Sequence, residues 1–268
     1  MSLLTGGVRA RAPQLARMLA VAWWLHVKML AVSAFEGFLQ VVWPLFFATT
    51  AFLVYRQSGD PQSLVYAGLG SAVMGTWSTI ATTASGVLQR ERWLGTLELL
   101  VASPTPFALV LVPITTAMAT LGLYSLVATL VWGRVLFGIT VPVAHPGLFG
   151  LSLLVSILAI AMFGFLLSVS VVRYRTAWAL GNLLEYPGWL LCGFLVPLAL
   201  FPEWARWVSY ALPPTWGMAA MREAAGGGSP WRDVLVCVGL GVGYAGMGAL
   251  LTETVLRSAR RHATLSLT

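Results

Sequence analysis

The fold is decided by the stretch Gln89-Arg90-Glu91-Arg92-Trp93-Leu94-Gly95-Thr96-Leu97-Glu98-Leu99-Leu100, which lies between two long apolar runs. Side chains of both charge signs cannot lie in lipid at low cost. This charged segment (residues 89–100) must therefore lie in water between two membrane spans. Another protein can reach it there, so its position already carries a functional hypothesis.

The composition indicates an integral membrane protein, because 58% of the 268 residues are hydrophobic and only 9% are charged. A spanning helix needs about 20 mostly apolar residues. The runs are continuous and lack the alternating period of lipid-facing strands, so they predict an all-α fold rather than a barrel. We predict one domain over residues 1–268 with six spanning helices: Phe35–Tyr55, Leu64–Leu88, Phe107–Leu136, Gly147–Val172, Ala177–Leu200 and Val234–Leu256.

The basic residues indicate membrane orientation rather than a nucleic-acid partner. With the amino terminus in the cytoplasm, eleven of the 16 Lys and Arg residues lie inside and the other five outside. This excess predicts that both termini, residues 1–34 and 257–268, are cytoplasmic. The inside set is Arg9, Arg11, Arg17, Lys28, Arg90, Arg92, Arg173, Arg175, Arg257, Arg260 and Arg261; the outside set is Arg56, Arg134, Arg206, Arg222 and Arg232.

Two further segments are predicted to lie along the membrane. Residues 8–32 repeat apolar side chains at helical spacing, which is typical of an interfacial helix. Residues 202–233 are too aromatic for a solvated loop, and Pro213 and Pro214 break the backbone. We expect short re-entrant helices there, covered by protein or by a water-filled cavity. Their candidate functional residues are Trp204, Trp207, Pro214, Thr215, Trp216 and Arg222.

The predicted fifth span contains a carboxylate. Asn182 and Glu185 are three residues apart and therefore share a helix face. A charged side chain at mid-membrane costs about 2.5 to 3.5 kcal/mol, so Glu185 should face protein or water. The candidates for a substrate pathway or gate are Asn182, Glu185, Tyr186 and Trp189. The alternative is an interhelical hydrogen bond in a helix kinked at Pro187, and both interpretations stay open.

Two sets of small residues predict close helix packing. Gly75, Thr79, Thr82 and Gly86 share one face of the second span, as a packing seam or as the lining of a pathway. The last span predicts a tight packing face, because it contains a GxxxG pair at Gly239 and Gly243 together with Gly241, Gly246 and Gly248.

On a helix, the charged segment places Trp93, Leu94, Leu97 and Leu100 on one side and its glutamates on the other. Pro104 and Pro106 end this helix before the third span. Because the connection is short, a displacement of the charged segment would be transmitted to the spans on either side of it. The candidate coupling residues are Arg90, Glu91, Arg92, Gly95, Thr96, Leu97 and Glu98.

The charged segment, followed by Ser103-Pro104, resembles the cytoplasmic motif of the permease subunits of type 2 ATP-binding-cassette (ABC) exporters. Leu212-Pro213-Pro214-Thr215-Trp216, with Arg222 after it, is similar to that family's Asn-Pro-Leu-Thr-Tyr segment, although Pro213 stands where Asn is usual. The resemblance implies a cytoplasmic interface helix, a coupling helix at the charged segment and external re-entrant helices. It also implies two permeases, identical or paralogous, driven by two ATPase subunits in a prokaryotic inner membrane.

The chain itself has no nucleotide site. A Walker loop needs Gly-x-x-x-x-Gly-Lys-Ser/Thr, and the only lysine, Lys28, has no such context. We therefore expect no cofactor or metal on this chain, and ATP with Mg on a separate ATPase. A membrane enzyme is disfavoured because HExxH and GxSxG are missing, and because His26, His145 and His262 are scattered.

The expected function is export of an apolar drug-like or natural-product molecule, since the chain has 12 Trp and 12 Phe. Membrane-interface belts also account for many of these aromatic residues. Export of lipid or polysaccharide is the alternative within the exporter class. An ATP-independent channel or secondary transporter is the alternative outside it, although such proteins commonly use several intramembrane ionisable groups.

Overall fold

The computed structural model describes residues 3–31, 34–57, 61–93, 95, 107–173 and 178–262. Within these ranges every regular element is a helix. The elements are α1 (Leu3–Ala31), α2 (Ala34–Arg56), α3 (Pro61–Trp93), α5 (Phe107–Phe137), α6 (Pro146–Arg173), α7 (Trp178–Leu191), the short 3-10 helix η1 (Leu198–Leu200), α8 (Glu203–Ala211), α9 (Pro213–Gly226) and α10 (Trp231–His262).

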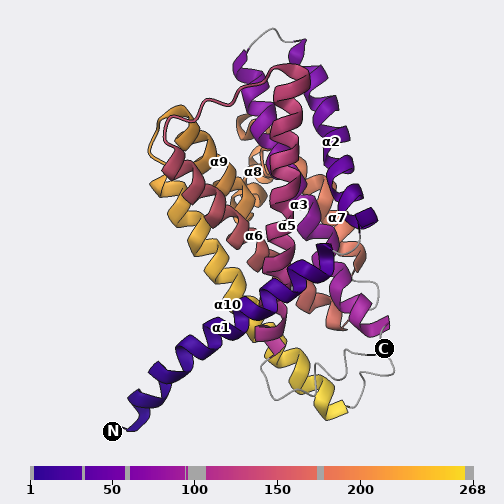
Figure 1. Ribbon diagram of the computed structural model, residues 1–268, viewed down its shortest axis with the longest axis vertical. Helices are drawn as coiled ribbons and strands as arrows, with labels where there is room; N and C mark the ends of the chain where they lie inside the picture. Colours follow the sequence, from indigo (N-terminus) through magenta and orange to yellow (C-terminus); the bar gives the residue numbers. More distant parts are fainter. Residues whose placement is uncertain are drawn as a thin grey trace.

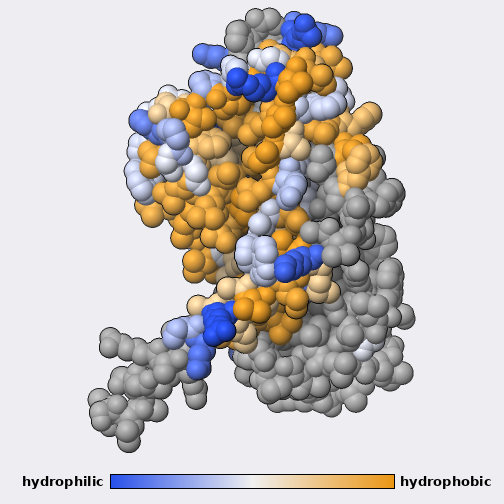
Figure 2. Space-filling view, in the orientation of Figure 1, coloured by the Kyte–Doolittle hydropathy of each residue, from blue (hydrophilic) through white to orange (hydrophobic). Residues whose placement is uncertain are grey.

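The long helices form a bundle around α3 (Figure 1). Helix α3 packs against α2, α5, α6 and α7, and α10 packs along α6. Helix α1 crosses the lower end of the bundle, where α3 and α10 also end, and α9 lies beside the upper part. In Figure 2 an apolar surface separates polar residues near the top of the view from those of α1 near the bottom. This distribution fits a bundle that crosses a membrane.

Three helices of the described chain are long and apolar enough to span a membrane on their own: Leu109–Phe137 in α5, Pro146–Val169 in α6 and Trp231–Thr254 in α10. They coincide with the third, fourth and sixth predicted spans. Helix α2 has nearly the bounds of the first predicted span. Helix α3 is less apolar because it is enclosed by protein, with Ser71, Thr76 and Ser78 all buried. Neighbouring helices rather than lipid therefore surround its middle.

The prediction of one continuous helix from Ala177 to Leu200 is wrong. Helix α7 ends at Leu191 and has 14 residues, about 21 Å at 1.5 Å per residue. Gly193 then adopts a φ of +70°, a left-handed conformation that glycine accepts without strain and that ends a helix. The apolar run Phe194 to Leu200 continues as bends and the short helix η1, so apolar composition alone overestimated the helix.

The predicted short helices before the last span are present as α8 and α9. Pro213 and Pro214 occupy the first positions of α9, where a missing N–H is harmless because it would have no intrahelical partner. The predicted amino-terminal helix is present as α1. It exposes much of its apolar side, including Leu15, Val21 and Met29, as expected of a helix that needs a further surface to cover it.

The charged segment begins as the end of α3. The helix runs to Trp93, so Gln89 to Trp93 continue the second span rather than form a separate helix. Gly95 has a φ of +69°, which interrupts any helix through that residue. The predicted coupling residues Thr96, Leu97 and Glu98, together with Leu99 and Leu100, lie outside the described residues.

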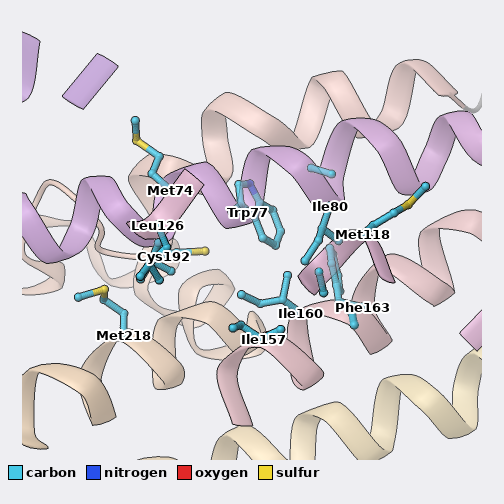
Figure 3. Packing of buried hydrophobic residues seen from close by; sticks show 14 of the residues in the cluster. Met74, Trp77, Ile80, Met118, Leu126, Ile157, Ile160, Phe163, Cys192 and Met218 are labelled. Carbon is cyan, nitrogen blue, oxygen red and sulfur yellow. The ribbon is translucent and has the colours of Figure 1, made fainter. Parts of the chain in front are cut away.

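The core lies between α3, α5 and α6. Figure 3 shows Trp77 of α3 among apolar side chains such as Ile80, Ile157 and Ile160. The Trp77 ring stacks on Phe163 of α6, with ring centroids 5.5 Å apart. A buried aromatic pair of this kind stabilises the packing by about 0.5 to 1.5 kcal/mol beyond the area that it buries. Helix α3 is thus the element on which the neighbouring helices are positioned.

The predicted glycine seams are only partly used. Gly239 and Gly243 of α10 face open space, and the close contacts are made by Gly241 against Ala159 and Gly248 against Phe165. Within the described chain the GxxxG pair itself therefore makes no close helix contact, whereas Gly241 and Gly248 of the same span do. On α3, the Thr79 hydroxyl donates to the carbonyl of Gly75 in its own helix, at 2.9 Å. A tight crossing with α5 lies at Thr76, opposite Gly122. The surroundings of Thr82 and Gly86 lie outside the described part of the chain.

Candidate functional site

The carboxylate predicted in the fifth span lies in a polar and aromatic cluster between α3 and α7, which we call the Glu185 site (Phe47, Trp77, Ser78, Glu185, Tyr186 and Trp189). The Glu185 side chain is 6% exposed. Trp77 donates its indole N–H to the Glu185 carbonyl at 3.2 Å. Trp189 donates its indole N–H to the Ser78 hydroxyl at 2.9 Å. These two bonds join neighbouring residues of α3 to one face of α7.

Ser78 also hydrogen-bonds the side chain of Glu185. Because the Ser78 oxygen accepts from Trp189, its own proton is available to donate to a carboxyl oxygen. The resulting chain runs from Trp189 through Ser78 to Glu185. The contact between Ser78 and Glu185 is an interhelical hydrogen bond, which was one of the two interpretations of Glu185. The other interpretation, a residue of the substrate pathway, stays open. Pro187 lies inside α7, which continues to Leu191.

The aromatic members of the site surround Trp189. The centroid of its ring lies 4.7 Å from that of Phe47 on α2 and 4.9 Å from that of Tyr186, and both pairs have edge geometry. Tyr186 is 50% exposed, whereas Trp189 is buried. Asn182 lies one turn before Glu185 on α7. Of the four predicted pathway residues, the structure therefore brings Glu185, Tyr186 and Trp189 together.

The chain between α7 and α8 is held by a second cluster, which we call the Arg222 cluster (Tyr55, Tyr66, Arg222 and the carbonyls of residues 193–195). Arg222 of α9 donates to the carbonyls of Gly193 and Phe194, both at 2.8 Å. Tyr66 of α3 donates its hydroxyl to the same Gly193 carbonyl at 2.9 Å. The Tyr55 hydroxyl of α2 donates to the Leu195 carbonyl.

These contacts satisfy three successive carbonyls after the end of α7. Non-helical backbone at membrane depth is tolerated only where protein or water satisfies it. The Arg222 guanidinium also lies over the Tyr66 ring, 3.3 Å from its centroid, as a cation–π contact. Burial lowers the pKa of Arg222 to about 10, so the guanidinium stays charged near neutral pH.

The other predicted external residues divide between two surfaces. Trp204 and Trp207 of α8 are exposed, at 70% and 68%. Pro214 and Thr215 of α9 are buried. Trp216 donates its indole N–H to the carbonyl of Tyr210 at 2.8 Å, which ties α9 to the end of α8. Helix α8 thus presents aromatic side chains outward, and α9 joins the bundle.

Tyr55, Tyr66 and Trp77 were not among the predicted functional residues. Their partners lie more than 100 positions away along the chain, so no local spacing signals these contacts. A tyrosine near a predicted helix end is only a weak indication of a functional role, because tyrosine is common at membrane interfaces in any case.

The predicted coupling residues Arg90, Glu91 and Arg92 lie on the last turn of α3, and Gly95 follows in a turn. They are at the end of the bundle where α1 crosses. Helix α1 is joined to α5 by a hydrogen bond from the Trp23 indole N–H to the Thr120 hydroxyl, at 3.0 Å.

Together, the apolar helices, the enclosed α3 and the charged helix end define a multi-pass helical membrane protein. No group of His, Cys, Asp and Glu in the described chain could hold a metal ion. The chain belongs to the ABC-2 type transporter family, whose model matches residues 17–225. Comparison with curated proteins gave no matching relative.

The family match confirms the resemblance drawn from the charged segment. The chain is the membrane component of an ABC-2 type transporter, a permease domain without ATPase activity of its own. Permeases of this family generally partner an ABC ATPase.

Proposed function

We propose that this chain is the permease of an ATP-driven exporter that moves an apolar drug-like or natural-product molecule out of the cytoplasm or inner leaflet. Two copies of a separate ATPase drive a pair of permeases, each a single six-span domain in a prokaryotic inner membrane with both termini inside. In this proposal α7 and the segment after it together form the fifth span, and α8 and α9 lie in the outer leaflet. The exposed Trp204 and Trp207 of α8 support that position, since Trp is enriched at membrane interfaces.

The observation that carries the proposal is the continuity of α3. This single helix of 33 residues, about 50 Å long at 1.5 Å per residue, runs from the Arg222 cluster to the charged segment. Between these ends, Trp77 and Ser78 bind α7 directly. A displacement of the Arg90 to Trp93 end therefore reaches the Glu185 site through one rigid element.

This connection supplies a mechanism for coupling. Nucleotide binding closes the two ATPases, and their movement displaces the charged segment of each permease. Because α3 contacts α7 through two indole hydrogen bonds, its shift changes the position of Glu185, Tyr186 and Trp189. Nucleotide binding energy thereby biases a two-state membrane element between inward and outward access.

Substituting Glu91 by alanine is the variant that tests this proposal. We expect the permease-dependent stimulation of ATP hydrolysis to fall at least about tenfold, because truncating one partner of a hydrogen-bonded charge pair across an interface costs about 2 to 5 kcal/mol. The measurement is ATP hydrolysis by the permease and its ATPase reconstituted together in vesicles, relative to the ATPase alone.

Glu223→Ala is the matched control, since Glu223 is exposed on α9, a helix that lies beside the upper part of the bundle. It should leave the stimulation unchanged. Equal stimulation by wild type and Glu91→Ala would contradict the proposed coupling role.

A further inference from the structure

We propose that the Glu185 site binds organic cations whose body is aromatic or apolar. This inference rests on the proposed function, because it assigns a chemical class to the substrate of the same pathway. It is carried by the charge, the burial and the aromatic surroundings of one carboxyl group.

The carboxyl of Glu185 lacks a cationic partner in the described part of the chain. Its side-chain contact is with the neutral Ser78 hydroxyl. The two indole N–H groups nearby are used elsewhere, by the Glu185 carbonyl and by Ser78 itself. A buried carboxylate is costly unless it is paired. A bound cation is the partner that would offset this cost.

The aromatic rings beside the carboxyl suit the body of such a cation. Phe47, Tyr186 and Trp189 lie in successive edge contacts with centroids 4.7 to 4.9 Å apart. Indole and phenol faces attract cations, and most strongly where water is excluded. The site therefore combines a carboxyl group with aromatic rings, the two kinds of group that attract an organic cation.

The exposed surface of α7 and α2 near the site is apolar. Leu183, Tyr186 and Leu190 are exposed on α7, and Phe46 is exposed on α2 beside Phe47. A molecule with an apolar body can reach these side chains from the membrane. A phosphate-bearing lipid or polysaccharide would instead bring negative charge toward Glu185, and like charges in a low-dielectric site repel strongly. The site therefore disfavours both of those substrate classes.

The test uses tetraphenylphosphonium and tetraphenylborate, which have nearly the same size and shape but opposite charge. Saturable binding of each ion to the full chain in lipid nanodiscs is measured against empty nanodiscs. We expect tetraphenylphosphonium to bind more tightly than tetraphenylborate. Glu185→Gln should weaken its binding about 10-fold to 100-fold, the range for losing one contact with a charged group.

Glu185→Asp keeps the charge and should retain most of the binding, and Glu223→Gln, an exposed glutamate, should retain all of it. If Glu185→Gln does not fold, the comparison of the two ions on the wild type decides the question. Equal affinity for the two ions, or unchanged phosphonium binding by a folded Glu185→Gln, would overturn the inference. Neither result would affect the proposed function, whose ATPase partnership is measured without these ions.

Discussion

Replacing Arg222 by alanine is expected to lower the free energy of unfolding by about 3 kcal/mol or more, because hydrogen bonds to a charged donor contribute about 1.5 to 3 kcal/mol each. The guanidinium donates to two carbonyls at 2.8 Å, those of Gly193 and Phe194. Without the guanidinium, these carbonyls lack hydrogen-bond donors, because the backbone there is not helical and supplies none of its own. The measurement is the unfolding midpoint of the full chain in detergent.

Two controls separate this effect from a general loss of positive charge. Arg232→Ala removes an exposed arginine from the start of α10 and should leave the midpoint unchanged. Arg222→Lys should be intermediate, because an ammonium lacks the planar fork that bonds two neighbouring carbonyls. An Arg222→Ala protein as stable as the wild type would show that the Arg222 cluster does not hold the segment after α7.

Replacing Gly70 by alanine is expected to produce a similarly large loss. A Cβ atom at this position would overlap the Phe194 carbonyl oxygen and lie 2.5 Å from the carbonyl carbon. The obstacle is backbone, so no side chain can rotate away. Forced packing of this kind costs about 1 to 3 kcal/mol, and here it also displaces the carbonyl that Arg222 binds. The unfolding midpoint is again the measurement.

Gly150→Ala is the matched control, since Gly150 lies on α6 with no atom near the position of a Cβ. It should be neutral or stabilising by up to about 1 kcal/mol, the helix preference of alanine over glycine. In an Arg222→Ala background, Gly70→Ala should cost less than it does alone, because both changes act on the Phe194 carbonyl. Strictly additive losses would contradict this shared mechanism.

Much of the architecture is predictable from local pattern. Continuous apolar runs predicted α5, α6 and α10, since lipid requires a minimum helix length. The predicted break at Pro213 and Pro214 became the start of α9, because proline restricts the residue before it and lacks an N–H. Such features depend on residues close together in the chain.

The end of α7 and the packing faces depend on distant residues. The backbone leaves the helix at Gly193 because Tyr66 and Arg222, from two other helices, satisfy the carbonyls that follow. An apolar run does not carry that information. The contacts of Gly241 and Gly248 likewise depend on which side of α10 meets α6, whereas the GxxxG pattern was equally compatible with the open side.

The sequence predicted Glu185 as a site residue, but it did not predict which residues of other helices contact it. A lone carboxylate in an apolar run identified Glu185, since such a residue must face protein or water. Ser78 and Trp77 complete the site from a helix more than 100 residues earlier, and only the fold brings them together.

Purification of the full permease from its native membrane shows whether a separate ATPase drives this chain through the charged end of α3. We expect a polypeptide with a Walker loop and ATPase activity to remain bound in equal numbers to the permease. Glu91→Ala should weaken this association, and Glu223→Ala should not. A folded permease that purifies without any such subunit, under conditions that preserve its unfolding midpoint, would rule out a partner ATPase at the charged segment.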